Sequence, residues 1–401
     1  MLTQKRDLRT GTPLWLKNGL PHFHRTKSSA KSYDVAVVGT GVSGALLTDA
    51  LLQAGLSVVA VDRRKILSGS TPASTALLQG ELDTPLIELE RKIGKSDAAR
   101  VWWRSAQAVQ ALTDRIQDLS IDCNHALRTS LYLPGNVLDV SDLKKEAAAR
   151  QKIGLRSVFI PRKILRDFAG LNKGGAIVSQ GNAEADPVKL VAGLWKSNVR
   201  RGATLIKNTE VTDIDHSLSK VQLHTRGGKS LTAGKVVFCT GYELMKFAKP
   251  RGYKVISTWV LATKPQKAKL WPSQSLIWEA GDPYLYLRTT QDGRVIVGGE
   301  DEEFSDEEKR DALIDQKVAA ISRKASKLFP EIDFQPEFSW TGSFGESPNG
   351  LPAIGPVKGM PHCFAVLGFG GNGITFSMLA AQLISRQIQG ISDPDADLFS
   401  L

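Results

Sequence analysis

The sequence predicts an α/β protein in which a discontinuous parallel-sheet domain carries an inserted, β-rich α+β domain. Three observations predict this fold class. Residues 33–62 contain a strand, a glycine turn, a helix and a second strand in succession. A second glycine-rich turn at 370–373 leads into a C-terminal helix. Between these turns, the pattern of residues 253–299 changes to β, with the two-residue alternation typical of strands at 284–288.

These patterns predict the domain boundaries. We expect an N-terminal arm over residues 1–32. The first domain should comprise residues 33–100, 186–245 and 340–401. The second, substrate-binding domain should comprise residues 101–185 and 246–339.

The first domain should begin with a Rossmann-type βαβ unit. Tyr33–Gly39 is a short apolar run that ends in glycine, which is typical of a buried parallel strand. A helix is predicted over Ser43–Ala54, and Gly55 should end it. Ser57–Asp62 then predicts the second strand. Such a crossover is right-handed.

The central part of the chain alternates between helix and strand signals. We expect a helix over residues 84–119, with a break at Gly94, and another over 186–202. Short strands should follow within 203–239, and a β-rich region within 253–299.

A late helix is predicted from a capping box, in which Ser305 precedes Glu308 by three residues. Pro330 should end this helix, and the surrounding acidic run, Glu300–Asp311, is most simply a solvated face. The last helix is expected over Ile374–Gln389.

Composition excludes several classes of protein. The chain has 401 residues, of which 42% are hydrophobic and 23% are charged, as in ordinary globular proteins. Its net charge of +11 could attract anions, nucleic acid or an anionic membrane surface. The basic residues are scattered without an RNA-binding signature, so a solvated basic surface is the simpler interpretation and a tRNA-binding role is disfavoured.

The cysteine pattern suggests neither a metal site nor a disulfide framework. Cys123, Cys239 and Cys363 are widely spaced, with no CxxC pair and no Cys/His cluster. Sparse cysteines fit a reducing compartment, and the sequence shows no secretory h-region and no run of 18 apolar residues. We therefore expect a cytoplasmic protein with at most peripheral membrane contact, and its oligomeric state stays open.

The turn after the first strand predicts a dinucleotide site. Gly39–Gly44 has the pattern GxGxxG between a strand and a helix. Gly39 permits the tight turn, Gly41 lets the backbone approach a pyrophosphate, and Gly44 lets the helix pack on the strand. Val42 and Ser43 open the helix, whose N–H groups can bind phosphate oxygens.

An acidic residue completes this motif. Asp62 ends the second strand, where a carboxylate can accept hydrogen bonds from a ribose hydroxyl. Arg63 and Arg64 raise the possibility of a 2′-phosphate, which Asp62 would repel. The motif by itself does not choose between FAD and NAD.

From Gly69–Leu78 (GSTPASTALL) onward, the chain resembles the D-amino-acid oxidase, glycine oxidase and sarcosine oxidase family of FAD enzymes. In that family, this loop touches the pyrophosphate and the flavin. Small hydroxyl side chains and exposed amides suit such contacts. The matching positions are Ser70, Thr71, Ser74, Thr75 and Leu77.

Three later segments extend the resemblance to the C-terminus. By this resemblance, Val211 should meet the adenine, and Thr240 and Gly241 should lie near the cofactor. The segment Leu351–Thr375 is similar to the one whose glycine-rich turn cradles the flavin. Its expected contacts are Gly370, Gly371, Asn372, Gly373, Ile374 and Thr375. A helix N-terminus there would stabilise the negative charge of the reduced flavin.

The resemblance implies an FAD-dependent oxidoreductase that acts on the C–N bond of an amine or amino acid. A hydride passes from Cα to flavin N5, and the imine product is then hydrolysed. The electron acceptor would be oxygen or a quinone-type molecule.

The sequence departs from the family at several positions. Ala76 and Ile296 stand where sarcosine oxidases carry an arginine and a lysine, and no cysteine lies near Gly342, where their flavin is attached. Residues 340–350 lack the carboxylate-binding arginine of glycine oxidases. We therefore expect non-covalent FAD and a substrate other than sarcosine.

The substrate side is predicted on a β-strand. Tyr284, Tyr286 and Arg288 fall at i, i+2 and i+4, and therefore on one face. Two phenols and a guanidinium could grip a substrate carboxylate. Alternatively, Arg288 pairs with Glu300 or Asp301 while the tyrosines pack.

Two other functions stay open at this point. An NAD-dependent Rossmann dehydrogenase would need the first βαβ unit but would leave the loop at 69–78 unexplained. A non-catalytic flavin-binding subunit of a larger complex would explain the missing arginine and lysine.

Overall fold

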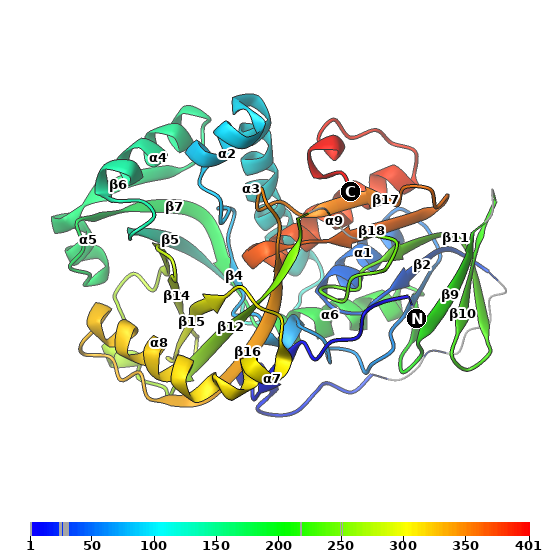
Figure 1. The fold of residues 1–401 in the computed structure, drawn as a ribbon, viewed down its shortest axis with the longest axis horizontal. Coiled ribbons are helices and arrows are strands. Elements are labelled where there is room, and N and C mark those ends of the chain that lie inside the picture. Colours follow the sequence, from blue (N-terminus) through cyan, green and yellow to red (C-terminus); the bar gives the residue numbers. More distant parts are fainter. Residues whose placement is uncertain (1, 24–25, 27–31, 217–218, 249, 251) are drawn as a thin grey trace.

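The computed structural model describes residues 2–401 except 24–25, 27–31, 217–218, 249 and 251. Two large sheets lie side by side, and helices pack around both of them (Figure 1). This architecture confirms the predicted α/β fold class, with one Rossmann-type unit and one β-rich unit.

The first sheet contains the predicted βαβ unit. Its strand order is β17-β18-β11-β2-β3-β8, and β9 and β10 extend it from β11. All neighbours from β18 to β8 run parallel, whereas β17 runs antiparallel to β18. The strands are β2 (Tyr33–Val38), β3 (Val58–Val61), β8 (Thr204–Ile206), β9 (Val211–His216), β10 (Val221–Thr225), β11 (Ser230–Phe238), β17 (Ala353–Pro356) and β18 (Cys363–Leu367).

The two faces of this sheet are covered differently. Val35 and Val37 of β2 pack with residues of the surrounding helices, whereas Ala36 faces the other way and packs near the β9–β10 hairpin. Because both faces are covered, all three residues have no exposed surface. The helices are α1 (Val42–Gln53), α3 (Lys95–Asp118), α6 (Pro187–Arg200) and α9 (Gly373–Ile388), each within two residues of its predicted bounds where a bound was predicted.

The second sheet has ten strands and is mostly antiparallel; β13 and β5 pair in parallel. Its order is β1-β16-β12-β15-β14-β13-β5-β7-β4, and β6 pairs with β7. The strands are β1 (Arg9–Gly11), β4 (Leu77–Leu78), β5 (Ala126–Pro134), β6 (Ser157–Pro161), β7 (Gly175–Glu184), β12 (Lys254–Thr263), β13 (Leu276–Ala280), β14 (Leu285–Thr289), β15 (Val295–Glu302) and β16 (Pro336–Glu346).

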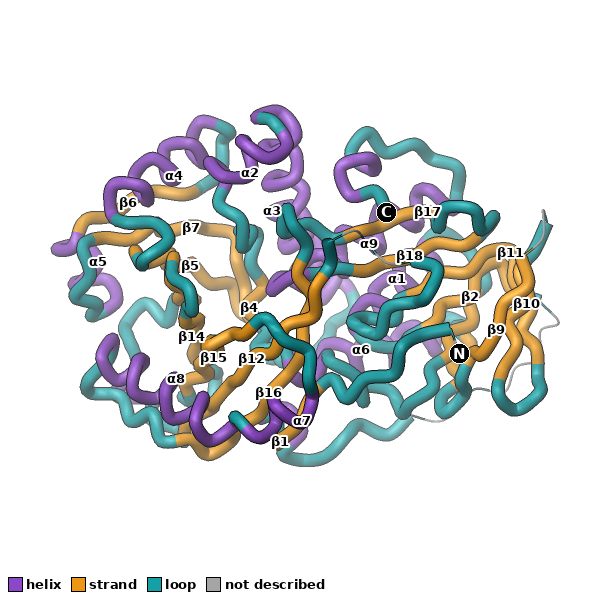
Figure 2. Tube along the Cα trace, in the orientation of Figure 1, coloured by secondary structure: helices purple, strands orange, loops and turns teal. Residues whose placement is uncertain are grey.

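Helices border this sheet as well, as the tube view shows (Figure 2). The long helix predicted over 84–119 is divided at Gly94, where φ is +89°, into α2 and α3. The helices around the ten-stranded sheet are α2 (Leu86–Ile93), α4 (Val140–Lys152), α5 (Arg162–Ala169), α7 (Glu307–Ala312) and α8 (Ile314–Leu328).

The prediction of one helix opened by Ser305 is wrong in two respects. Asp306 is the N-cap residue, and its side chain accepts a hydrogen bond from the backbone N–H of Lys309. The helix is also interrupted at Leu313, which separates α7 from α8. Aspartate caps a helix as well as serine does, so composition could not choose between the two adjacent residues.

The N-terminal arm and the start of the predicted C-terminal segment both contribute to the ten-stranded sheet. Strand β1 of the N-terminal arm pairs with β16, and the boundary predicted at residue 340 falls inside β16, a strand of the ten-stranded sheet. Within the described part of the chain, no helix is long and apolar enough to cross a membrane.

Candidate functional site

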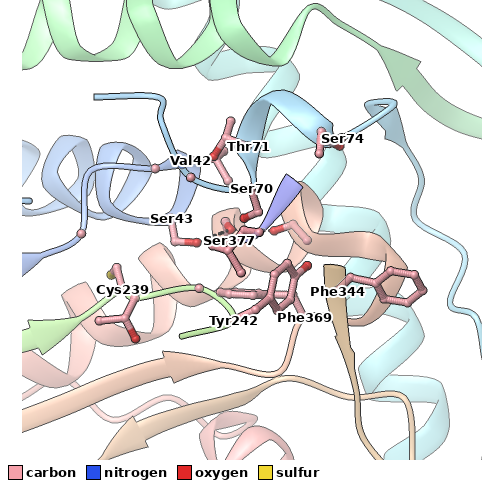
Figure 3. Close-up of a pocket in the computed structure, with 18 of the residues that line it drawn as sticks. Val42, Ser43, Ser70, Thr71, Ser74, Cys239, Tyr242, Phe344, Phe369 and Ser377 are labelled. Carbon is pink, nitrogen blue, oxygen red and sulfur yellow. Dashed lines mark hydrogen bonds between the residues drawn. The ribbon is translucent and has the colours of Figure 1, made fainter. Parts of the chain in front are cut away.

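The main cavity lies at the carboxyl ends of β2, β3 and β11, where parallel α/β sheets usually bind ligands. Its opposite wall comes from the ten-stranded sheet, through residues such as Thr258 and Tyr286. Figure 3 shows side chains from both sides of the cavity converging on one space.

The glycine motif has the geometry that its sequence predicts. Gly39 has a φ of +110°, and a Cβ there would lie 2.2 Å from the carbonyl oxygen of Cys239. A Cβ on Gly44 would lie 2.0 Å from the Gly39 carbonyl oxygen, so only glycine lets α1 pack this closely. Gly41 faces the cavity, where Thr71 Oγ1 would lie 3.1 Å from its Cβ. The loop therefore brings bare backbone to the cavity wall.

Asp62 lies at the same end of the cavity. Its Oδ2 accepts hydrogen bonds from the backbone N–H and hydroxyl of Thr40, at 2.8 and 2.9 Å. Its Oδ1 accepts the N–H of Arg64 at 2.8 Å. Burial raises the pKa of this carboxyl, while these hydrogen bonds oppose the shift. Asp62 is thus fixed in place, and its oxygens retain lone pairs for a hydroxyl donor.

Arg63 and Arg64 share one buried carboxylate. Both guanidinium groups form ion pairs with Glu243. Burial opposes ionisation of Glu243, but hydrogen bonds from the two arginines hold its pKa below the ordinary value. Because Glu243 partly neutralises these two guanidinium groups, they are less suited to bind a 2′-phosphate.

The hydroxyl-rich loop borders the N-terminus of α1. Thr71 Oγ1 accepts a hydrogen bond from the backbone N–H of Val42 at 3.2 Å, and Ser43 and Ser377 hydroxyls lie 2.7 Å apart (Figure 3). The cavity lining contains most of the predicted cofactor residues: Gly39, Gly41, Val42, Ser43, Asp62, Arg63, Ser70, Thr71, Ser74, Thr75, Leu77, Val211, Thr240, Gly241, Gly370, Gly371, Asn372, Gly373 and Ile374.

Two predicted cofactor residues lie behind this lining. Gly44 supports the glycine loop, as described above. Thr375 is buried, and its hydroxyl donates to the carbonyl of Gln79 at 3.0 Å. Both therefore shape the wall of the cavity and have no surface on it.

The glycine-rich turn before α9 reaches the other end of the cavity. The N-cap residue Asn372 makes no capping bond with its side chain, which instead donates to the Glu81 carbonyl at 2.5 Å. The N–H of Gly371 donates to Asp83 Oδ2 at 2.9 Å. The N-termini of α1 and α9 thus open onto one cavity.

The end of the cavity near α9 is aromatic. Trp278, Tyr284, Tyr286 and Phe344 line it, and Trp278 pairs with Tyr286 across strands β13 and β14. Burial raises the pKa of Tyr286 above its ordinary range, so the phenol stays protonated. The predicted Tyr284 and Tyr286 therefore do lie at the cavity.

Arg288 departs from its predicted role. Its Nη1 donates to the carbonyls of Thr75, Ala76 and Ala185 at 2.8–3.1 Å, and its side chain is fully buried outside the cavity lining. Its nearest carboxylate is Glu184, at 3.6 Å, and not Glu300 or Asp301. The strand alternation is correct, but the loop at 75–76 covers this part of the face. Arg288 therefore supports the cofactor loop.

A second cavity adjoins the first. The two share Asp83, Trp278, Tyr284, Phe344 and Gly370 in their linings. Asp301, at the end of β15, lines the second cavity and not a solvated face as predicted. The sequence did not identify Asp83 and Asp301 as cavity residues, because neither stands in a motif. The one local signal was that Asp83 precedes Thr84-Pro85, which is typical of a turn.

The N-terminal arm also contributes to the main cavity. Leu2, Thr3 and Leu8 line it, and the backbone N–H of Arg6 donates to Glu243 at 2.8 Å. No sequence pattern indicated this contact, because it depends on the arm folding back over distant segments.

Fold and site together define a dinucleotide-binding protein of the oxidoreductase type. One cavity end offers a bare glycine loop, a helix N-terminus and a carboxylate, which suits an ADP moiety. The other offers a second helix N-terminus beside aromatic rings, which suits a flat, redox-active ring. An FAD molecule, with its pyrophosphate near Gly41 and its flavin near Gly370, fits this donor set.

Comparison with known proteins gives the family. Residues 34–387 match the FAD dependent oxidoreductase family. The chain is 23% identical over 386 residues to "Gamma-glutamylputrescine oxidoreductase" of Escherichia coli (strain K12), covering 93% of this chain and 87% of that protein. The crystal structure of glycine oxidase from Geobacillus kaustophilus has a TM-score of 0.76 at 22% identity, covering 93% and 99% of the two chains. L-proline dehydrogenase from P. horikoshii also has a TM-score of 0.76, at 17% identity, covering 92% and 97%.

The chain therefore belongs to the FAD-dependent oxidoreductase family that the sequence resemblance predicted. FAD is its cofactor, and the protein is an oxidoreductase. The alternative of an NAD-dependent dehydrogenase is thereby set aside.

Proposed function

We propose that this protein oxidises the C–N bond of an amine or amino acid and passes the electrons to oxygen or a quinone-type acceptor. The observation that carries the proposal is the continuity of the two cavities. A small molecule in the second cavity would reach the aromatic end of the first, beside Gly370 and Asp83. Relatives named for amine and amino-acid oxidation support the same reaction class.

The reaction balances without a metal or a protein nucleophile. FAD held by the lining of the main cavity would supply the acceptor for a hydride, which is two electrons and one proton, from the substrate carbon next to nitrogen. Loss of the hydride would convert the neutral amine into an iminium. The iminium would lose a proton to solvent, and one water molecule would hydrolyse the resulting imine to a carbonyl compound and an amine or ammonia. Among the described residues, no group of histidine, cysteine and carboxylate side chains is arranged to hold a metal ion.

The residues of the chain position this reaction. Trp278, Tyr286 and Phe344 surround the space near α9 with rings that exclude water from the reacting carbon. The N-terminus of α9 supplies positive potential where negative charge develops. Positioning of this kind can provide most of the rate enhancement when no protein base is required.

We infer that FAD is held without a covalent bond. Cys239 lines the main cavity, but it lies beside the glycine loop, and burial raises the pKa of its thiol to about 12. A thiol that stays protonated is a poor nucleophile. The proposal retains a cytoplasmic location, as predicted from the sequence.

Anaerobic reduction tests the proposed function. Holoprotein is mixed with a panel of amines and amino acids, and bleaching of the flavin absorbance is followed. The proposal expects at least one class of amine to bleach the flavin. If no amine bleaches a flavin that dithionite reduces normally, the non-catalytic flavin-binding subunit becomes the better explanation. Reoxidation of the bleached protein by oxygen and by a soluble quinone then identifies the acceptor.

A further inference from the structure

The second cavity is strongly acidic. Its lining includes eight carboxylates, and Lys92 is the one basic side chain among the described lining residues. The chain as a whole carries a net charge of +11, so this concentration of acids is local. The carboxylates are Asp83, Glu88, Glu279, Asp282, Asp301, Glu302, Glu303 and Glu346.

Several of these acids are neutralised by lysines at the edge of the cavity. Glu279 pairs with Lys173, and Glu303 pairs with Lys254. Glu88 and Glu302 are likewise paired, with Lys92 and Lys317. The negative charge at the rim of the cavity is therefore partly neutralised by these four lysines.

Asp301 is different from the acids at the rim. Both of its carboxylate oxygens are buried, and neither has a hydrogen-bond partner. The hydroxyls of Thr258 and Tyr284 lie close to it and lower the pKa of its carboxyl, without balancing the opposite effect of burial. Burial, with the charges of Asp83 and Glu300, raises its pKa to about 7. A buried carboxylate without a partner is costly, and such groups mark functional sites.

Asp83 lies on the wall shared by the two cavities. Its Oδ2 accepts the N–H of Gly371, and no ion pair with a described residue neutralises it. Its side chain is exposed to the cavity space although protein surrounds it. Asp83 and Asp301 thus place two carboxylates in the lining of the second cavity, and neither has an ion-pair partner among the described residues.

Aromatic faces accompany these acids. Tyr132 and Trp278 stack with their ring centroids 3.8 Å apart, and the rings of Tyr284 and Tyr286 lie 5.6 Å apart. Tyr132, Trp278 and Tyr284 line the acidic cavity. Ring faces and carboxylates together attract ammonium groups and repel carboxylates.

We propose that the substrate carries a second cationic group, distant from the reacting C–N bond, and that Asp301 binds it within the acidic cavity. The chemical class is aliphatic diamines and polyamines. This inference rests on the proposed function insofar as the bound diamine is to be oxidised. Binding of the cation does not depend on it. Asp301 is here a specificity-determining residue, since it acts on the charge remote from the reacting carbon.

Three compounds of equal chain length separate the possibilities. They are 1,4-diaminobutane, n-butylamine and 4-aminobutanoate, whose far ends are cationic, neutral and anionic. Binding to holoprotein is measured under anaerobic conditions by perturbation of the flavin spectrum, and reduction is measured by bleaching. A charged hydrogen bond contributes about 1.5–3 kcal/mol, so the diamine should bind about 10- to 100-fold more tightly than n-butylamine. The amino acid should bind most weakly.

Asp301→Asn tests the residue itself. It should remove about tenfold or more of the diamine affinity and change that of n-butylamine less than about twofold. The matched control is Glu308→Gln, which removes one exposed carboxylate outside both cavities and should change neither. If Asp301→Asn does not yield folded holoprotein, the ranking of the three compounds on the wild-type protein still decides.

The outcomes distinguish this inference from the proposed function. If n-butylamine or 4-aminobutanoate binds and reduces the flavin as well as the diamine, the cationic class is wrong and amine oxidation stands. If Asp301→Asn weakens all three compounds equally, the assignment of Asp301 is overturned. If the diamine binds through Asp301 but no amine reduces the flavin, the cation site stands and the proposed function fails.

Discussion

Substitution of Gly41 by valine separates cofactor binding from folding. In the structure, Gly41 has φ and ψ of −69° and −166°, which other residues can adopt. A Cβ there would have one close neighbour, Thr71 Oγ1 at 3.1 Å, and a hydroxyl side chain can rotate away. We therefore expect the cost of Gly41→Val to folding stability to lie at the low end of the about 1–3 kcal/mol typical of inserting a larger side chain.

The cost to cofactor binding should be much larger. The valine methyl groups would occupy the space through which a pyrophosphate approaches the N-terminus of α1. Loss of two hydrogen bonds to a charged phosphate, at about 1.5–3 kcal/mol each, weakens binding by about 10²- to 10⁴-fold. The purified variant should be folded and nearly free of flavin.

The assay is the ratio of flavin to protein after purification, together with thermal unfolding of the apoprotein. Gly227→Val is the control, since Gly227 is exposed with open space around its Cβ position. Gly44→Ala provides the contrast, because its Cβ would meet the Gly39 carbonyl at 2.0 Å and should prevent folding. A folded Gly41→Val protein with a normal flavin content would refute the assignment of the pyrophosphate site.

Three further changes test other parts of the structure. The pKa of Asp301 is raised from 3.8 to about 7, so its ionisation opposes folding fully above about pH 7 and not below about pH 4. Asp301→Asn should therefore increase the free energy of unfolding of the apoprotein at pH 8 by up to about 4 kcal/mol. Its Tm should rise at pH 8 and stay unchanged at pH 4. If the variant and the wild-type protein have the same Tm at pH 8 as well as at pH 4, the burial of this charge is contradicted. Arg288→Lys should lower Tm and speed FAD release, since one ammonium group cannot replace the guanidinium hydrogen bonds to the carbonyls of Thr75 and Ala76. If the variant instead shows only a raised KM for amino acids, the predicted role of Arg288 in binding the substrate carboxylate would be favoured. Deletion of residues 2–12 should speed FAD dissociation without unfolding the sheets, because Leu2 and Leu8 line the cavity. If the dissociation rate measured by flavin fluorescence is unchanged, the arm does not help to retain FAD.

The parts of this site that could be predicted from sequence are local. Gly39, Gly41 and Gly44 are required by contacts within one βαβ unit, and Asp62 follows from the same unit. The turn at Gly370–Asn372 was recognisable because glycine before a helix has a local geometric meaning.

The remaining parts depend on long-range packing. Arg288 lies on the predicted face of its strand, but only the fold shows that residues 75–76 cover it. Asp301 resembled a member of a solvated acidic run, because nothing in its neighbours shows that β15 continues through Glu302 along a cavity. Its partner Asp83 comes from a segment more than 200 residues away in sequence.

The most direct test of the account is the visible spectrum of purified holoprotein before and after anaerobic addition of 1,4-diaminobutane. We predict a yellow protein that releases FAD on denaturation and whose flavin absorbance is bleached by the diamine. A protein that cannot bind FAD would contradict the cofactor site. A flavin that dithionite reduces but no amine bleaches would contradict the proposed oxidation of a C–N bond.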